Sequence, residues 1–325
     1  MIDREFVTSC YRAILGREPD NASVVEEKLA WASSAEALIR EFLDSAEFQS
    51  RLPRRIADDY FRQKARIDVD VSELEKQALF QRMQIQWREL GRQEPFWSVL
   101  THDEYRTTDI DDAALARFYK TGAEHAGLLD LFCARNEVEI RRGVCLELGC
   151  GVGRVTKHLA KRFEKIIAAD ISEGNLVHCK AMAEREGISN IECVLIKTPD
   201  TLISMPYLDC FYSTIVLQHN PPPIQKIQLE LIMNKMTPGG VFFFQTQTYA
   251  ADYCFHVDEY LRSPIGIMDM HSLPMHEILH VIERHGHSLC EVAADMWTGR
   301  YGSHTFFGYS RPQRQQPRLL ESASL

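Results

Sequence analysis

From Val144 onward, short apolar runs alternate with stretches of helical periodicity, and this alternation limits the fold of the 325-residue chain more than any other feature. Strands that are separated by helices are joined by crossover connections, which predicts a mostly parallel sheet with helices on both faces. The expected fold class is therefore α/β with a doubly wound sheet. The expected strands are Val144–Leu148, Ile166–Ala169, Ile191–Ile196, Asp209–Leu217, Gly240–Thr246, Ser288–Ala293 and Thr305–Tyr309.

The first of these strands runs into a glycine-rich turn in the segment CLELGCGVGR. Gly149, Gly151 and Gly153 let the backbone take positive φ and leave no Cβ in the way of a ligand. A helix expected to begin near Arg154 adds unpaired N–H groups and a partial positive charge. The GxGxG spacing differs from the GxGxxG of dinucleotide sites.

The second strand ends at a carboxylate, Asp170, which lies 21 residues beyond Gly149. A carboxylate at this place accepts hydrogen bonds from both ribose hydroxyls, which indicates an adenosine-containing ligand. The alternative is a structural turn followed by a solvated aspartate. The elements come in the order that a ligand site needs, so the ligand site is the favoured interpretation.

Four motifs in order resemble those of the class I S-adenosylmethionine-dependent methyltransferases: LELGCGVGR, IIAADIS, YLDCFYSTIVLQHN and MTPGGVFFF. The resemblance runs from Val144 to about Arg311, with upstream support from FYKTG. It implies S-adenosylmethionine as the methyl donor and a Rossmann-like, seven-stranded sheet whose last strand, Thr305–Tyr309, is antiparallel. It also implies that Pro-Gly-Gly makes a tight turn before the fifth strand.

The resemblance also implies roles for individual residues. The three glycines approach the methionine and ribose, Glu147 orients their loop, and Asp170 binds the ribose. Thr198 stands roughly where the family often carries an acid for the adenine amine. Gln218 and His219 would lie near the methyl group. The implied cofactor-binding residues are Tyr119, Gly122, Glu147, Gly149, Gly151, Gly153, Asp170, Ile171, Thr198 and Gln218.

The segments FFFQTQTYAADYCFHVDEY and MDMHSLP follow the carboxyl ends of strands, where open α/β sheets bind ligands. We expect them to expose amides and aromatic rings that suit a sugar acceptor, although an ordinary solvated loop is an equal alternative. The side chains expected to be exposed are Gln245, Gln247, Tyr249, Tyr253 and His256, of which Gln245, Tyr249 and His256 are the candidate substrate-binding residues. His219 is the first candidate for a general base, because a neutral imidazole accepts a proton near pH 7, and His271 is the second.

Two further motifs match specific functional patterns, but an ordinary structural role is the favoured interpretation of each. NPPP, Asn220–Pro223, is similar to the Asn-Pro-Pro-aromatic motif of amino-methyltransferases, but Pro223 replaces the aromatic residue. The prolines are expected to open the next helix. HEILH, His276–His280, matches a zinc protease pattern, but no third ligand is marked. We expect a surface helix and no metal site.

The first 135 residues are expected to be helical, with helical periodicity in EFVTSCYRAILGR, AEALIREFLDSAEFQSRL, Val71–Leu90 and Asp111–Ala134. YRAILGREPD and FLDSAEFQSR resemble a small helical domain found with bacterial glycosyltransferases. That resemblance implies a bacterial setting in surface-glycan assembly, with the helices docking a partner or a second copy. The predicted division is a small domain at 1–52, a helical linker or lid at 53–135, a methyltransferase domain at 136–311 and a disordered tail at 312–325.

Composition narrows the class of protein. The net charge is −9 with no basic stripe, which argues against nucleic acid as a partner. The nine cysteines form no CxxC pair and fit a reduced, cytoplasmic protein. The N-terminus lacks the apolar run of a signal peptide, and no apolar run is long enough to cross a membrane.

The sequence thus predicts an S-adenosylmethionine-dependent O-methyltransferase that acts on a sugar or glycan precursor. The alternatives are N- or O-methylation of a small metabolite or protein, a cofactor-binding partner subunit without turnover, and a zinc hydrolase based on His276–His280.

Overall fold

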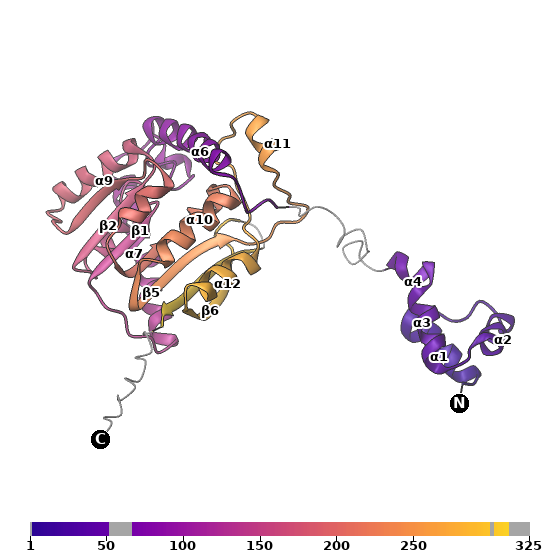
Figure 1. Cartoon of the computed structure of the whole chain (residues 1–325). Helices are drawn as coiled ribbons and strands as arrows, with labels where there is room; N and C mark the ends of the chain where they lie inside the picture. The colour runs from indigo at the N-terminus through magenta and orange to yellow at the C-terminus, as the bar shows by residue number, and fades with distance from the viewer. Residues whose placement is uncertain (1, 52–66, 300–301, 312–325) are drawn as a thin grey trace, which may run out of the picture. The chain divides into compact units, whose positions relative to one another are not determined.

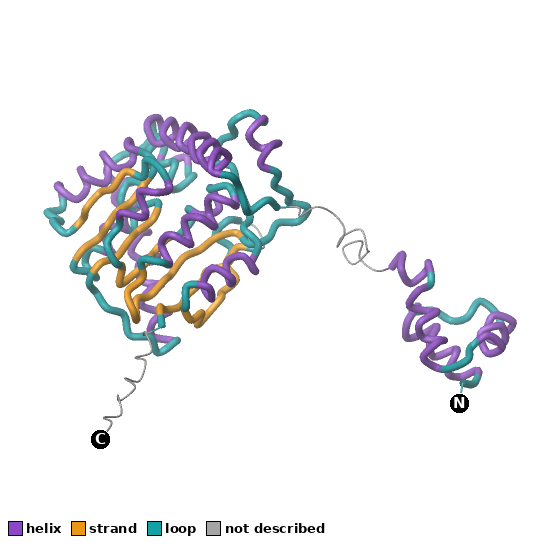
Figure 2. The backbone as a smooth tube through the Cα atoms, in the orientation of Figure 1, coloured by secondary structure: helices purple, strands orange, loops and turns teal. Residues whose placement is uncertain are grey.

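The computed structural model describes residues 2–51, 67–299 and 302–311, which fall in two compact units, Met1–Ala65 and Arg66–Leu325 (Figure 1). The first unit is helical, whereas the second combines helices with a sheet (Figure 2). The predicted boundary at residue 52 and the predicted tail 312–325 lie outside the described residues. The predicted domain limits stay predictions.

The first unit has a hydrophobic core of its own. Its helices are α1 (Arg4–Leu15), α2 (Ala22–Trp31), α3 (Ala35–Asp44) and α4 (Ala46–Arg51). Asp3, Asn21 and Ser34 cap the first three helices by accepting a hydrogen bond from a backbone N–H. The buried core residues are Val7, Cys10, Tyr11, Leu15, Val25, Leu38 and Phe42. The prediction of a helical N-terminal region is confirmed.

The second unit is built on a seven-stranded sheet in the order β3-β2-β1-β4-β5-β7-β6. The strands are β1 (Val144–Leu148), β2 (Lys165–Asp170), β3 (Ile191–Leu195), β4 (Leu208–Ser213), β5 (Met236–Gln247), β6 (His287–Asp295) and β7 (Ser303–Ser310). The first five strands pair in parallel, whereas β7 is antiparallel to both β5 and β6. The predicted doubly wound sheet with an antiparallel last strand is confirmed.

Helices cover both faces of this sheet. The helices are α6 (Glu73–Gln93), α7 (Asp112–Arg135), α8 (Thr156–Leu159), α9 (Glu173–Arg185), α10 (Pro222–Met233), α11 (Val257–Arg262) and α12 (Met275–Arg284). One core contains buried residues of α6, α10 and α12, and the other contains buried residues of α7, α8 and α9. Short 3-10 turns cover Asp103–Tyr105, Pro199–Ser204 and Leu217–His219. No helix in the described ranges is long and apolar enough to cross a membrane.

Several predicted element limits were wrong, including the end of the fourth strand, the start of the fifth strand and the start of the helix after the glycine turn. The fourth strand ends at Ser213 rather than Leu217, because Ile215 takes a positive φ of 59° that breaks the extended chain. The fifth strand begins at Met236, and Pro-Gly-Gly lies inside it at a register shift rather than in a separate turn. The helix after the glycine turn begins at Thr156 rather than near Arg154.

Because β1, β2 and β4 are parallel, their carboxyl ends lie at the same edge of the sheet. Helix α6 contacts α9, α10 and α11 (Figure 1). Its close approach to α9 depends on Gly91, where a Cβ would lie 2.1 Å from Ser172 Oγ. The loops after the strands and the buried face of α6 therefore enclose the space at this edge.

Candidate functional site

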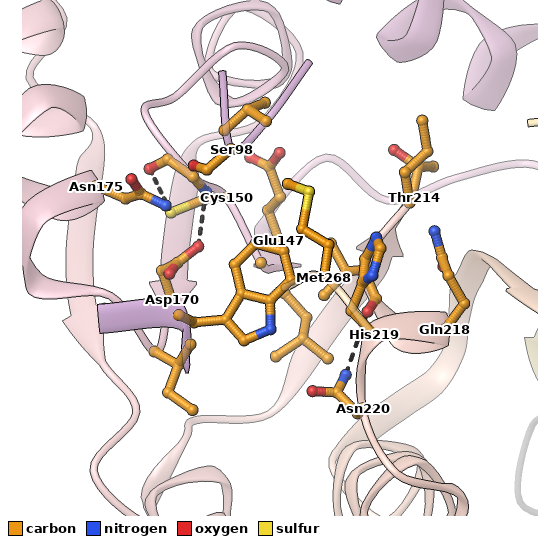
Figure 3. Close-up of a pocket in the computed structure, with 18 of the residues that line it drawn as sticks. Ser98, Glu147, Cys150, Asp170, Asn175, Thr214, Gln218, His219, Asn220 and Met268 are labelled. Atoms are coloured by element: carbon orange, nitrogen blue, oxygen red, sulfur yellow. Dashed lines mark hydrogen bonds between the residues drawn. The ribbon is translucent and has the colours of Figure 1, made fainter. Parts of the chain in front are cut away.

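A cavity of about 360 Å³ lies at the carboxyl ends of β1, β2 and β4. Its walls come from α6, from residues 98–101, from the loops after these three strands, from residues 268 and 270, and from residues 297 and 298. In the view of Figure 3, Asp170 and Asn175 lie on one side, while Gln218 and His219 lie on the other. This is the position at which open α/β sheets bind ligands.

The glycine turn is shaped by close packing as well as by backbone conformation. Gly149 and Gly151 have φ of 72° and 55°. A Cβ at Gly149 would lie 2.4 Å from the Val216 side chain, and a Cβ at Gly151 would lie 2.5 Å from Val99 Cγ2. Any larger residue would therefore push the turn away from the loops that line the cavity.

Asp170 ties the end of β2 to this turn. Its Oδ2 accepts a hydrogen bond from the Gly151 N–H at 2.8 Å, and its Oδ1 accepts one from the Ser172 N–H at 2.7 Å. Burial raises the pKa of this carboxyl to about 6, although both hydrogen bonds oppose the shift. Asp170 and Ile171 both line the cavity, and their roles on ribose and adenine stay predictions.

Two further titratable side chains, Glu147 and Arg154, line the cavity beside the glycine turn. Burial raises the pKa of Glu147 to about 8, so this carboxyl is protonated at neutral pH, and its Oε2 has no partner. Arg154, which the sequence did not single out, is buried and lines the cavity. Its Nη1 donates to Thr121 Oγ1 at 3.2 Å, and its Nη2 lies 3.4 Å from His125 Nδ1, but its Nε has no partner.

The loop after β4 brings Gln218 and His219 to the opposite side of the cavity. The Nδ1 of His219 lies 3.1 Å from the Asp269 carbonyl oxygen, which can only accept, so Nδ1 carries the hydrogen and Nε2 keeps a lone pair. Burial lowers the pKa of His219. Gln218 is fully buried, and neither atom of its amide has a partner. The Trp87 ring meets the His219 ring edge-on at 5.2 Å.

His271 lies behind this loop and does not line the cavity. Its backbone N–H donates to the Gln218 carbonyl oxygen at 2.7 Å, and its Nδ1 lies 2.9 Å from the Tyr253 hydroxyl. Burial lowers its pKa to about 3, which makes the imidazole a weak base. His271 lines a second, shallower hollow together with Tyr253 and His256.

Four of the implied cofactor residues, Tyr119, Gly122, Gly153 and Thr198, do not line the cavity. Gly153 has a φ of 86°, and a Cβ there would lie 2.6 Å from Met182 Cε. The Tyr119 hydroxyl donates to the Val152 carbonyl oxygen at 3.1 Å, and Gly122 packs so closely that a Cβ would lie 1.9 Å from the Arg154 carbonyl oxygen. Both residues belong to α7 and support the glycine turn from behind. Thr198 is exposed at the start of the 3-10 turn Pro199–Ser204.

The expected exposure of the amides in β5 was wrong. Gln245 is fully buried, where its Oε1 accepts from the Ile215 N–H at 2.8 Å and its Nε2 donates to Ser303 Oγ at 2.7 Å. Gln247 is also buried, because β5 is an inner strand whose two faces are both covered. Neither lines the cavity.

The remaining acceptor candidates lie farther along the chain. Tyr249 is exposed beyond the end of β5 and does not line the cavity. His256 sits at the N-cap of α11, with its Nδ1 3.6 Å from Asp68 Oδ2.

The NPPP motif lies at the start of a helix and the HEILH motif lies within one, and both are ordinary structural positions. Pro222 and Pro223 form the first turn of α10, as expected for prolines at a helix start. His276 and His280 are exposed on α12, and Glu277 lies 3.1 Å from Lys226. The residues that the structure describes contain no group of three side chains able to hold a metal ion.

Residues 145–240 match a family model described as a methyltransferase domain. Phosphoethanolamine N-methyltransferase 1 of Zea mays is 28% identical over 112 residues, which are 34% of this chain and 21% of the relative. The phosphoethanolamine N-methyltransferase of Triticum aestivum is 27% identical over the same shares. The chain thus spans about a fifth of the length of these curated relatives. The matched family model does not include the first 52 residues, so the resemblance of that region to a small helical domain stays a prediction.

Among solved structures, magnesium protoporphyrin IX methyltransferase from Synechocystis PCC 6803 with bound SAH has a TM-score of 0.47 at 14% identity. The similarity covers 69% of this chain and 97% of that chain. Residues 145–240 therefore resemble a methyltransferase domain, and the order of the seven strands and the glycine turn agree with that resemblance.

Proposed function

We propose that the chain transfers a methyl group from S-adenosylmethionine to a hydroxyl oxygen of a small acceptor, with His219 as the general base. The observation that carries the proposal is the position of His219. It lines the same cavity as the glycine turn, and the Asp269 carbonyl oxygen engages its Nδ1, so that Nε2 is left to accept a proton.

The residues around the turn fit S-adenosylmethionine. Gly149 and Gly151 line the cavity with positive φ and no side chain, which leaves their backbone open to a ligand. Buried polar atoms of Glu147, Asn175 and Gln218 lack partners and line the cavity. Asp170 and Ile171 would hold the ribose and adenine, and the buried Arg154 would face the carboxylate of the methionine part. These side chains support the assignment.

When bound, S-adenosylmethionine would supply a methyl group activated by its positively charged sulfur for transfer to the acceptor oxygen. His219 Nε2 takes the hydroxyl proton. Because burial lowers the pKa of His219, its imidazole stays neutral and able to accept a proton at neutral pH. The Trp87 ring and the Asp269 carbonyl fix the orientation of this imidazole.

The prediction of a sugar or glycan acceptor rested on side chains that do not line this cavity. Gln245 and Gln247 are buried in the sheet, and His256 lines the second hollow. We therefore favour a small hydroxyl compound over a sugar. The second candidate is N-methylation, which the names of the two plant relatives favour.

Replacing His219 tests the proposal. Purified chain is incubated with methyl-labelled S-adenosylmethionine and fractionated cell extract, and the labelled product is isolated and its methylated atom determined. His219→Ala should lower the transfer rate by about a hundredfold or more, the usual contribution of a general base, while the affinity for S-adenosylhomocysteine stays unchanged. The control is His276→Ala, which removes an exposed imidazole outside the cavity.

Two results would contradict the proposal. An unchanged transfer rate in His219→Ala would remove His219 as the base. Tight binding of S-adenosylhomocysteine without transfer to any fraction would favour a cofactor-binding partner subunit that has no turnover of its own.

A further inference from the structure

The cavity is uneven in charge. Among the described residues that line it, the carboxyl and guanidinium side chains are Glu147, Arg154 and Asp170, while the imidazole of His219 is neutral. Glu147, Arg154 and Asp170 belong to β1, the glycine turn or the end of β2, which together form the cofactor half. The opposite part of the cavity, here called the acceptor half, is lined by Trp87, Thr214, Gln218, His219, Met268 and Met270.

From this division we infer that the acceptor is an uncharged molecule with a flat, apolar body and a reacting hydroxyl. The inference rests on the proposed function, because it assigns the far side of the same cavity to the methyl acceptor. It adds the chemical class of that acceptor, which neither the matched family model nor the names of the relatives specify for this chain.

The polar groups of the acceptor half suit neutral partners. Thr214 offers a hydroxyl, Gln218 offers an amide whose two polar atoms have no partner, and His219 offers the lone pair of a neutral imidazole. A phosphate, carboxylate or ammonium group placed here would find no oppositely charged side chain among the residues named for the acceptor half. An unpaired charge in such surroundings is strongly disfavoured, whereas a neutral oxygen needs only a hydrogen bond.

The other side chains of the acceptor half are an indole ring and two flexible thioethers, which can pack against a flat ring. Trp87 presents an indole ring beside His219, with the two ring centres 5.2 Å apart. Met268 and Met270 add two thioethers, and Met268 lies close to His219 in the view of Figure 3. Thioether sulfur packs favourably against aromatic rings and fills irregular space around them. Such walls favour an aromatic or conjugated body over a polyhydroxylated one.

The segment that carries the two methionines is anchored to α6. Arg82 donates to the Ser263 carbonyl oxygen at 2.8 Å, and Gln86 donates to the Gly266 carbonyl oxygen at 2.7 Å. The Arg82 guanidinium also lies over the Tyr260 ring, 4.4 Å from its centre. Arg82 therefore makes its contacts outside the cavity. Helix α6, which also carries Trp87, holds the segment with Met268 and Met270 in place.

A matched pair of probes tests the charge requirement. 2-Naphthol and 6-hydroxy-2-naphthalenesulfonate share one ring system and one hydroxyl but differ by a negative charge. Each is titrated by calorimetry into the full chain saturated with S-adenosylhomocysteine, so that binding is measured without turnover. 2-Naphthol should bind at least about tenfold more tightly than the sulfonate, and phosphoethanolamine should bind more weakly still.

The outcomes separate this inference from the proposed function. If S-adenosylhomocysteine itself does not bind, the proposed function fails and the inference fails with it. If S-adenosylhomocysteine binds but the sulfonate or phosphoethanolamine binds as tightly as 2-naphthol, the inference alone is overturned. Absence of 2-naphthol binding in the presence of bound S-adenosylhomocysteine also overturns it.

A charge introduced at Met268 provides the second arm. Met268→Lys should reverse the preference by about tenfold or more in favour of the sulfonate, because the new ammonium supplies the missing counter-charge. Met268→Leu keeps an apolar wall and should preserve the preference for 2-naphthol. The matched control is Met296→Lys, since Met296 is 54% exposed and outside the cavity lining. An unchanged preference in Met268→Lys, with an unchanged unfolding temperature, would exclude residue 268 from the acceptor site.

Discussion

Two buried carboxyl groups beside the glycine turn titrate at different pH values. Burial raises the pKa of Asp170 to about 6 and that of Glu147 to about 8. Asp170 is the lower of the two although both are buried, because the Gly151 and Ser172 N–H groups stabilise its ionised form. Between roughly pH 5 and pH 7, Asp170 therefore changes charge while Glu147 stays protonated.

Asp170→Asn should remove the pH dependence of cofactor binding in this range. In the wild-type chain, the affinity for S-adenosylhomocysteine should fall as pH drops through about 6, because the protonated carboxyl loses its charge and one acceptor. Asparagine is uncharged at both ends of the range, so the variant should bind more weakly and equally at each pH. Calorimetry across the range checks this, and a flat wild-type profile would contradict it.

The contribution of Asp170 to the free energy of unfolding of the ligand-free chain should decrease as pH rises, whereas the affinity for S-adenosylhomocysteine should increase. The pKa of Asp170 in the folded chain lies above the ordinary aspartate value, so the folded state binds more protons than the unfolded state between the two values. Its contribution to the free energy of unfolding therefore decreases as pH rises toward about 6. Chemical denaturation of the wild type and of Asp170→Asn at several pH values isolates this contribution.

Gly151→Ala should disrupt the turn through a clash rather than through backbone strain alone. The control is Gly187→Ala, because Gly187 has a similar φ of 64° but nothing within 4 Å of its missing Cβ. The control should lose about 1 kcal/mol of stability from the positive φ. Gly151→Ala should lose about 1–3 kcal/mol more from contact with Val99, together with its affinity for S-adenosylhomocysteine. Equal losses in the two variants would mean that the contact is relieved without cost.

At the scale of elements, β5 does more than contribute to the core. Its Gln245 holds the Ile215 N–H of the loop after β4 and the Ser303 hydroxyl of β7. The Ser303 hydroxyl in turn donates to an Asp295 oxygen at the end of β6. The loop that carries Gln218 and His219 is thus tied to three neighbouring strands through one amide.

Gln245→Leu should weaken both stability and turnover. The leucine leaves the Ile215 N–H without its partner, which should cost about 1–3 kcal/mol of the free energy of unfolding. The shifted loop should lower the methyl transfer rate more than the affinity for S-adenosylhomocysteine. Gln84→Leu serves as the control, because Gln84 makes one exposed hydrogen bond to the Lys197 carbonyl. Loss of stability with full activity would show that the loop keeps its position without the amide.

The strand positions and the glycine turn were predictable because they depend on local patterns: apolar runs, glycine spacing and an acid at a strand end. The antiparallel last strand followed from the family resemblance. The burial of Gln245 was not predictable, since alternation along a strand cannot show that both faces of an inner strand are covered. Trp87, Arg154 and Met268 were also missed. They reach the cavity through contacts between segments far apart in the chain, and no short motif marks such contacts.

At the scale of the whole molecule, the described residues form two units with separate cores. Every residue that lines the cavity belongs to the second unit. Removal of residues 1–51 should therefore leave the affinity for S-adenosylhomocysteine and the unfolding temperature of the sheet unit unchanged. Calorimetry and thermal unfolding of the shortened chain check this, and a loss of either would show that the first unit supports the site.

Three of the six residues that define the acceptor half lie outside the segment that carries the cofactor half. Trp87 precedes the matched methyltransferase segment 145–240, and Met268 and Met270 follow it. Substitutions in these flanking segments leave the glycine turn and Asp170 untouched. Under the proposed function, divergence at Trp87, Met268 and Met270 changes the apolar wall that faces the acceptor while the donor site and His219 stay the same, so similarity confined to residues 145–240 leaves that wall unspecified.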